Sequence, residues 1–134
     1  MPDTRRVEAQ VAQLLSDQGE PLLDEDGNPA AWAEHVYRFV ITVGAKSKVS
    51  VGDKYVIYSL GNEVKDPMLD ISLGKLEIVR GRAAVVHVQE SISILRTIDT
   101  KIVRRQYLLP GMPETETVEV PIRVLQIGDF ARPI

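Results

Sequence analysis

The sequence has 134 residues, with 16 basic and 19 acidic side chains, 44% apolar residues and no cysteine. This length and composition predict one globular domain over residues 1–134, with a real core and with neither disulfides nor a zinc ribbon. The net charge of −3 and the aromatic content of 5% argue against a general nucleic-acid binder, which needs surplus Lys and Arg and stacking rings.

The first 34 residues are predicted to be a helical and turn-rich segment that packs on the rest of the domain. Four apolar residues recur at the spacing of one helix face and predict a helix over residues 4–15. Asn28 followed by Pro29 is typical of a helix start, so a short second helix through Trp32 is expected. The alternative is a hairpin with its tip at Asp26-Gly27. The apolar residues of the first helix are Val7, Val11, Leu14 and Leu15.

The beginning of the chain does not look like a targeting segment. Residues 1–6 are charged and no apolar stretch follows them, so no signal peptide is expected. The longest apolar runs, such as residues 39–43, have the length of strands and predict no membrane span. The compartment stays unknown: the cytoplasm is expected by default, and the periplasm if the sequence is a trimmed part of a longer chain.

From residue 36 onward the apolar period changes from helical spacing to alternation. Alternating Ile, Val and aromatic residues, with turn signals between them, predict about seven short antiparallel strands. No helix-sized segment intervenes to support parallel crossovers, so we expect a mainly β fold. The specific expectation is a small SH3-like or related β-barrel over residues 36–127, with the N-terminal helix beside it. The expected strands span residues 36–43, 55–60, 76–79, 83–90, 92–98, 102–109 and 118–127.

Residues 92–109 are predicted to form a long hairpin that turns at Asp99-Thr100. Residues 110–117 then form an acidic loop, and Pro121 indicates an edge position or a bulge in the last strand. The hairpin gathers positive charge in an otherwise acidic protein, as at an anion or RNA contact, although a solvated barrel face is the simpler interpretation. Its candidate partner-binding residues are Arg96, Lys101, Arg104, Arg105 and Tyr107.

No pattern in the sequence predicts catalysis, a cofactor or a metal. The two histidines, His35 and His87, lie far apart, and no Gly-x-Ser-x-Gly elbow accompanies any serine. The nine glycines are dispersed, so no phosphate-binding loop is expected. The acidic run of residues 24–28 fails the spacing of an EF-hand and is expected to be a solvated turn.

The middle of the chain resembles the carboxy-terminal domain of the flagellar assembly protein T family and related small bacterial barrel domains. The similarity covers about 45 residues, from Val49 to Ser93, although the tip at residues 69–71 departs from the usual Thr-Gly-Glu turn. The resemblance implies a small β-barrel that serves assembly of an envelope ring by protein contacts, without catalytic residues. The matching motif residues are Gly52, Asp53, Gly61, Asp66, Pro67, Gly74, Gly81, Gln89 and Glu90.

Three hypotheses follow. The first is a non-catalytic barrel that binds protein partners through the loop connecting two strands at residues 61–74 and through the hairpin of residues 92–109, in a bacterial envelope, a flagellar-type or another assembly. The second is an SH3-like barrel that binds RNA or another anion. The third is an enzyme without a recognisable motif. Exposed strand edges that pair with an extended partner, or with a second copy in a homodimer, remain open within the first hypothesis.

Overall fold

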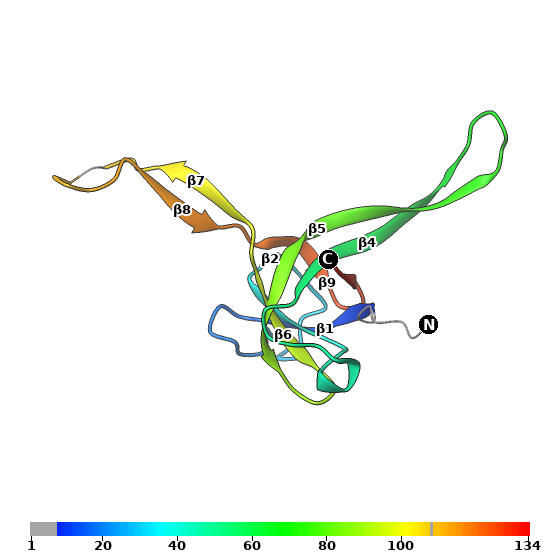
Figure 1. The fold of residues 1–134 in the computed structure, drawn as a ribbon, viewed down its shortest axis with the longest axis horizontal. Coiled ribbons are helices and arrows are strands. Elements are labelled where there is room, and N and C mark those ends of the chain that lie inside the picture. Colours follow the sequence, from blue (N-terminus) through cyan, green and yellow to red (C-terminus); the bar gives the residue numbers. More distant parts are fainter. Residues whose placement is uncertain (1–7, 108) are drawn as a thin grey trace.

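The computed structural model describes residues 8–107 and 109–134 and consists of ten β-strands and one short 3-10 helix, η1 (Ala45–Ser47) (Figure 1). The strands are β1 (Ala9–Leu15), β2 (Trp32–Val36), β3 (Arg38–Ile41), β4 (Lys54–Lys65), β5 (Ser72–Val88), β6 (Ser93–Thr97), β7 (Thr100–Arg104), β8 (Thr115–Glu119), β9 (Ile122–Gln126) and β10 (Phe130–Pro133).

Six of the strands form a closed barrel in the order β1-β10-β4-β5-β6-β3, and every pair is antiparallel. The remaining strands form two separate two-stranded sheets, β2-β9 and β7-β8. The mainly β, antiparallel barrel predicted from the alternating pattern is therefore confirmed. No helix among the described residues is long and apolar enough to cross a membrane.

The predicted N-terminal helix is wrong over the described residues. Ala9–Leu15 is strand β1, while residues 4–7 lie outside the described part of the chain. The strand has a bulge between Val11 and Gln13, where its register against β3 shifts. The extra residue lets both Val11 and Leu14 point into the core, three positions apart. The apolar spacing that predicted a helix is therefore produced by a strand with a bulge.

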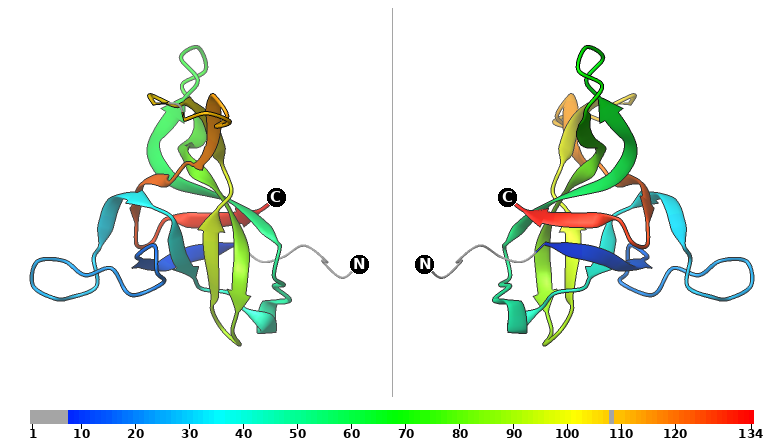
Figure 2. Two further views of the ribbon diagram at one scale, coloured as in Figure 1. Left: turned by 90° about the vertical axis from the view of Figure 1, so that its left-hand side faces the viewer. Right: turned by 90° about the vertical axis from the view of Figure 1, so that its right-hand side faces the viewer.

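The second predicted helix is also wrong, because Trp32–Val36 is strand β2. The alternative hairpin is confirmed. Isolated bridges join Leu15 to Pro21 and Leu23 to Pro29, and the Asp24 carboxylate accepts hydrogen bonds from the backbone N–H groups of Asp26 and Asn28 at the tip. Residues 16–31, which we call the acidic hairpin, project from one side of the barrel (Figure 2).

The predicted barrel boundaries, residues 36–127, are wrong at both ends. Strand β1 pairs with both β3 and β10, and β10 pairs with β4, so the two ends of the described chain close the barrel. Conversely, β2, β7, β8 and β9 fall within residues 36–127 or next to them and lie outside the barrel sheet. Closure removes the free edges that an open sheet of β3 to β6 would expose.

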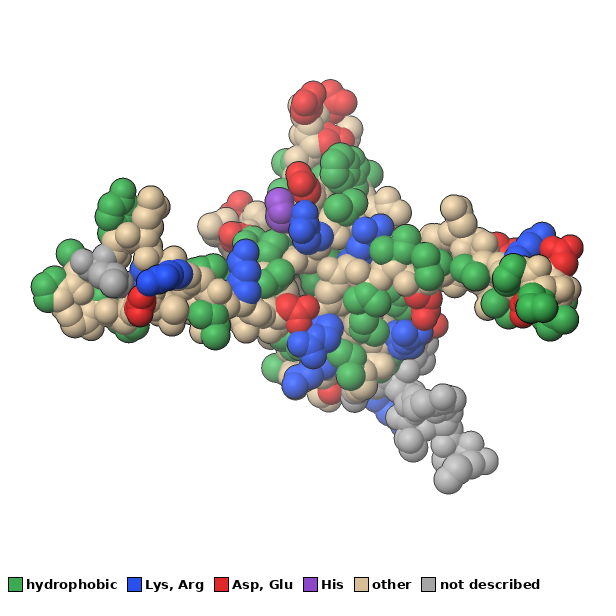
Figure 3. Space-filling model, turned by 90° about the horizontal axis from the view of Figure 1, so that it is seen from above, with side chains coloured by type: hydrophobic (Ala, Val, Ile, Leu, Met, Phe, Trp, Pro, Cys, Tyr) green, Lys and Arg blue, Asp and Glu red, His purple; other side chains and the backbone are tan. Residues whose placement is uncertain are grey.

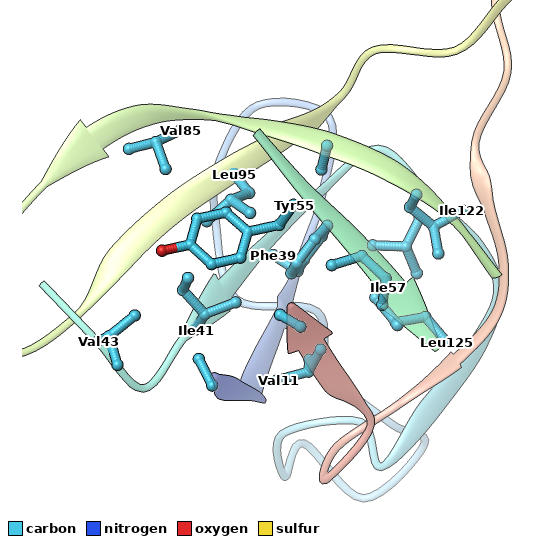
Figure 4. Packing of buried hydrophobic residues seen from close by; sticks show 14 of the residues in the cluster. Val11, Phe39, Ile41, Val43, Tyr55, Ile57, Val85, Leu95, Ile122 and Leu125 are labelled. Atoms are coloured by element: carbon cyan, nitrogen blue, oxygen red, sulfur yellow. The ribbon is translucent and has the colours of Figure 1, made fainter. Parts of the chain in front are cut away.

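The hydrophobic core lies inside the barrel and is built from side chains of the barrel strands and of β9 (Figure 4). Phe39, Tyr55 and Leu95 come from barrel strands and are completely buried, and Ile122 and Leu125 close the core from β9. Gly81 permits this closure, because a Cβ at that position would lie 2.5 Å from Cδ1 of Ile122. Strand β9 thus packs on the barrel without pairing with it.

Strands β4 and β5 continue far beyond the barrel as a two-stranded ribbon (Figure 1). The connection predicted between Gly61 and Gly74 is therefore largely strand, with only residues 66–71 left as the turn. The two predicted strands at 76–79 and 83–90 are one strand of 17 residues.

The predicted 92–109 hairpin is wrong. Strand β6 pairs with β3 and β5 inside the barrel, and β7 pairs with β8 in a sheet of its own. Asp99 directs this change, because its carboxylate accepts hydrogen bonds from the backbone N–H and Nε of Arg82, and its carbonyl accepts one from the N–H of Val120. These long-range hydrogen bonds hold Asp99 at the rim of the barrel, and β7, which begins at the next residue, leaves the barrel from there.

The last predicted strand, residues 118–127, is divided in two. Pro121 separates β8 from β9, since it has no N–H to donate to a ladder. The last part of the predicted acidic loop, residues 115–117, belongs to strand β8, Thr115–Glu119.

Candidate functional site

Two β-arms project from the barrel in different directions and are the most conspicuous candidate surfaces (Figures 1 and 3). We call residues 60–79, the outer parts of β4 and β5 with their turn, the apolar arm. We call residues 100–119, which contain β7 and β8, the charged arm.

The apolar arm exposes nine large hydrophobic side chains. Met68 at the tip is 91% exposed, and Leu73 and Val79 are more than 60% exposed. Soluble monomers rarely expose contiguous apolar surface of this kind, and it often marks an interaction site. The nine residues are Leu60, Val64, Met68, Leu69, Ile71, Leu73, Leu76, Ile78 and Val79.

Both faces of the apolar arm carry exposed hydrophobic side chains. Leu76 and Ile78 alternate onto one face, where Ile78 covers the position of Gly61; a Cβ there would lie 3.1 Å from Cδ1 of Ile78. Leu60 is paired with Glu77, and Val79 is paired with Tyr58, so Leu60 and Val79 occupy the opposite face. Lys75 and Glu77 share that opposite face, so one face of this segment is apolar and the other mixes hydrophobic with charged side chains.

Local turn chemistry forms the tip of this arm. The Asp66 carboxylate accepts hydrogen bonds from the N–H groups of Met68 and Leu69, at 2.8 and 3.1 Å, in an Asx turn. Gly74 has a φ of +99°, where the register shifts as the strand leaves the turn. These interactions shape the ribbon without burying its apolar side chains.

Polar and aromatic contacts attach the apolar arm to the barrel. Glu77 accepts two hydrogen bonds from the Arg132 guanidinium, at 2.8 and 3.2 Å. The same guanidinium lies 4.9 Å from the centre of the Tyr58 ring, and Tyr58 stacks on Phe130. The Tyr58 hydroxyl also donates a hydrogen bond to Glu8. These contacts fix the base of the arm to the barrel.

The charged arm is built from cross-strand ion pairs. Arg104 pairs with Glu114 at 2.7 Å, and Arg105 pairs with Glu116 at 3.4 Å. Between the ion pairs, Val103 and Val118 lie on one face and are only partly exposed. Basic side chains occupy the outgoing strand and acidic side chains the returning one, so the positive charge of the arm is neutralised within it.

A third ion pair fixes the base of the charged arm to the barrel. The Arg96 guanidinium on β6 donates two hydrogen bonds to the Glu119 carboxylate on β8, at 2.7 and 2.6 Å. These hydrogen bonds hold the pKa of Glu119 below its ordinary value of 4.5 and raise the pKa of Arg96. Next to this pair, the Thr97 hydroxyl donates to the Val120 carbonyl at 2.6 Å.

The predicted partner-binding residues are therefore found in different settings. Arg96, Arg104 and Arg105 all bind glutamates, and the basic hairpin expected from the sequence is not a patch of unpaired positive charge. Lys101 is exposed and lies opposite Val118, and Tyr107 is 81% exposed near the end of the arm. Among the five, these last two form no ion pair with a described residue.

Most of the family-motif residues form turns or close contacts of the scaffold. Gly52 has a φ of +95°, and Asp53 accepts a hydrogen bond from the N–H of Ser50, so together they make the tight turn into β4. The carbonyls of Gln89 and Glu90 accept hydrogen bonds from the N–H groups of Ala45 and Lys46 at η1. The remaining motif residues belong to the apolar arm, except Gly81, which lies under Ile122.

Sequence reasoning missed the apolar residues of the arm as a group, because residues 61–74 were assigned to a connection. A signal was present, since Leu69, Ile71, Leu73 and Leu76 are unusually apolar for a solvated loop. Several hydrophobic residues in a segment predicted to be a loop therefore indicate an exposed arm of this kind.

The part of the chain that the structure describes offers little chemistry elsewhere. Its histidines, His35 on β2 and His87 on β5, are both exposed, and no group of three or more His, Cys, Asp or Glu in it is arranged to hold a metal ion. An open recess of about 500 Å³ lies inside the acidic hairpin. Its lining residues are Leu22, Leu23, Asp24, Glu25, Ala30, Ala31 and Trp32.

The comparisons with known proteins add no relative from which a function can be transferred. No family model, curated protein or solved structure matches this chain. The resemblance to the flagellar assembly protein T family therefore stays a prediction from the motifs between Val49 and Ser93.

Proposed function

We propose that this protein is a non-catalytic assembly module, in which the barrel is a scaffold and the arms contact other protein subunits. The observation that carries the proposal is the apolar arm, with nine exposed large hydrophobic side chains on a two-stranded ribbon. An isolated hairpin is at best marginally stable in water, and further strands or packing are needed to stabilise it. A partner surface supplies that packing.

The charge distribution supports a protein partner over a nucleic acid. Binding to phosphates needs cations that are free to replace counterions. In the charged arm, Arg104 and Arg105 are already bound to Glu114 and Glu116, and Arg96 is bound to Glu119. The arm is better suited to polar contacts with a protein than to a phosphate backbone. A bacterial envelope or flagellar-type setting, and the SH3-like class of the barrel, are expectations from the sequence that we carry into this proposal.

Site-specific photocrosslinking in the cells that produce the protein tests this function. A photoreactive residue replaces Leu69 in the apolar arm or Tyr107 in the charged arm, one position at a time. Val51 is the matched control, because it is a 66% exposed hydrophobic residue at a turn of the barrel. We expect protein adducts at Leu69 and Tyr107 that survive nuclease treatment, and fewer at Val51.

Two outcomes would count against the proposal. Adducts that disappear with nuclease would favour the RNA-binding alternative. Equal yields of adducts at Val51 and at both arms would show that the arms have no special role in protein contacts.

A further inference from the structure

The outer edge of β5 in the apolar arm has no strand beside it. Between Ser72 and Val79, β5 pairs only with β4, and β6 joins its other edge only from Ala83 onward. No other described strand pairs with this edge. The free segment is eight residues long, or about 27 Å at a typical strand rise. A long apolar edge of this kind is a template for pairing with another chain.

If β5 of a second copy runs antiparallel along this edge, the side chains of the two identical strands are complementary in charge and in hydrophobic character. In a twofold pairing centred on Leu76, that residue meets its own counterpart, and Lys75 lies directly opposite Glu77 of the second copy. The symmetry forms this ion pair twice. Opposite charges at directly paired positions stabilise a sheet, and like charges destabilise it.

The flanking positions of the same register also match. By residue count, Leu73 falls opposite Val79 of the second copy, and both are exposed hydrophobic residues, at the end of the register where β5 has its extra residue. Ile78 lies opposite Gly74, where the position of an added Cβ has no heavy atom within 4 Å, so there is room for the isoleucine side chain. Lys75 has no ion-pair partner among the described residues of its own chain, whereas Glu77 is held by Arg132.

We infer that the apolar arm forms a twofold homodimer, in which β5 pairs with β5 of a second copy around Leu76. The two ribbons become one four-stranded sheet, β4-β5-β5-β4, which has the number of strands that independent stability requires. This inference rests on the proposed function and names the partner of the arm as a second copy of the chain.

The other free edges fit this role less well. In the charged arm, β7 carries only positive charge and β8 only negative charge, so pairing either strand with its own copy opposes like charges. The outer edge of β4 has one complementary set, Glu63 and Lys65 around Val64. An extra residue interrupts β4 between Leu60 and Glu63, directly beside this set, and Pro67, which lacks an N–H, follows soon after. The extra residue of β5 lies between Ser72 and Lys75, outside its own central set of Lys75, Leu76 and Glu77.

Charge reversal at the paired positions tests the inference on the full chain. Sedimentation velocity over a wide range of concentrations measures the dissociation constant of the wild-type dimer, of Lys75→Glu and of Glu77→Lys. Each single variant opposes like charges twice, so we expect at least about tenfold weaker dimerisation. An equimolar mixture of the two variants restores complementary pairs, and we expect it to dimerise within a few-fold of wild type.

Lys65→Glu is the matched control, because it reverses a charge on the other strand of the same arm and lies opposite the uncharged Ser72, whereas Glu63 lies opposite Lys75 itself. It is expected to leave dimerisation unchanged, and an effect as large as that of Lys75→Glu would overturn the β5 assignment in favour of the β4 edge. Circular dichroism melts verify that each variant is folded.

Two further results would overturn the inference. One is a wild-type protein that sediments as a 14.9 kDa monomer at every concentration. The other is a mixture of the two variants that stays as weakly associated as each variant alone. If the wild type is monomeric while Leu69 crosslinks to a different protein, the homodimer fails and the proposed function stands.

Discussion

The apolar arm and the charged arm are both two-stranded antiparallel ribbons on the same barrel, but they differ in the side chains that they expose to solvent. The charged arm stabilises itself with cross-strand pairs between Arg104 or Arg105 and a facing glutamate, with valines between them. The apolar arm has hydrophobic residues on both faces, and no ion pair among its described residues joins its two strands. One arm is therefore stabilised by contacts within the monomer, whereas the other leaves its hydrophobic side chains exposed, and we propose that a partner covers them.

The same difference decides how each arm meets a second copy. Segregating one sign of charge on each strand favours pairing within the arm and opposes pairing between identical strands. The alternating Lys75, Leu76 and Glu77 favour pairing between identical strands. Edge charges can thus either protect a ribbon from association or specify it, depending on whether the signs segregate or alternate along the strand.

The largest expected effect comes from removing the apolar character of the first arm. In the triple variant Leu73→Thr, Leu76→Thr and Val79→Thr, strand propensity is kept and apolar contact is lost. Since burial of each such side chain contributes about 1.5–3 kcal/mol, we expect association to weaken at least about a hundredfold by sedimentation. Ile102→Thr, at a 73% exposed position of the charged arm, is the control and should change nothing. Unchanged association of the triple variant would move the interface off this arm.

Reversing the charges of the second arm should open it locally. In the double variant Arg104→Glu and Arg105→Glu, like charges face Glu114 and Glu116. We expect amide hydrogen exchange in β7 and β8 to become about tenfold faster, with the thermal midpoint nearly unchanged, because the side chains are outside the core. Lys101→Glu, opposite Val118, serves as the control and should have a much smaller effect. Unaltered exchange in the double variant would show that the ion pairs do not stabilise the arm.

A matched glycine pair compares the turns of the two arms. Gly74 and Gly111 have φ values of +99° and +79°, and a Cβ at either position meets no heavy atom within 4 Å. Changing either residue to alanine should cost about 1 kcal/mol of local stability through backbone strain alone, seen as faster hydrogen exchange in that arm only. In Gly81→Ala the new Cβ would instead approach Ile122, so the barrel itself should melt at a lower temperature.

The smallest effect concerns the ion pair at the base of the charged arm. Arg96 and Glu119 are both about one-third exposed, so solvent screens them and Glu119→Gln should cost only about 0.5–1 kcal/mol. Because the pKa of Glu119 is lowered by folding, its contribution to stability is present above about pH 4.5 and is lost as the pH falls through the lowered value. Urea unfolding of wild type and Glu119→Gln should therefore converge in acid. A gap that persists in acid would assign the difference to packing.

Local chemistry made several parts of this fold predictable. The alternation after Val36 indicated antiparallel strands, and dipeptides such as Asp26-Gly27 and Gly52-Asp53 marked turns that the structure contains. The candidate site was predictable only in part. The exposed Lys101 and Tyr107 were identified, but the arginines proved to be paired, because a sequence does not show which glutamate faces which arginine.

Residues close together in the chain specify the β class, tight turns such as that at Gly52-Asp53, and the alternating charges around Leu76, so these features can be read from the sequence. Tertiary contacts make β1 a strand, join the two ends of the described chain into the barrel, and lead β7 away from β6 to pair with β8. Each of these choices is a competition between strands far apart in sequence. Contacts such as Asp99 with Arg82 and Val120 settle that competition, and no local period records them.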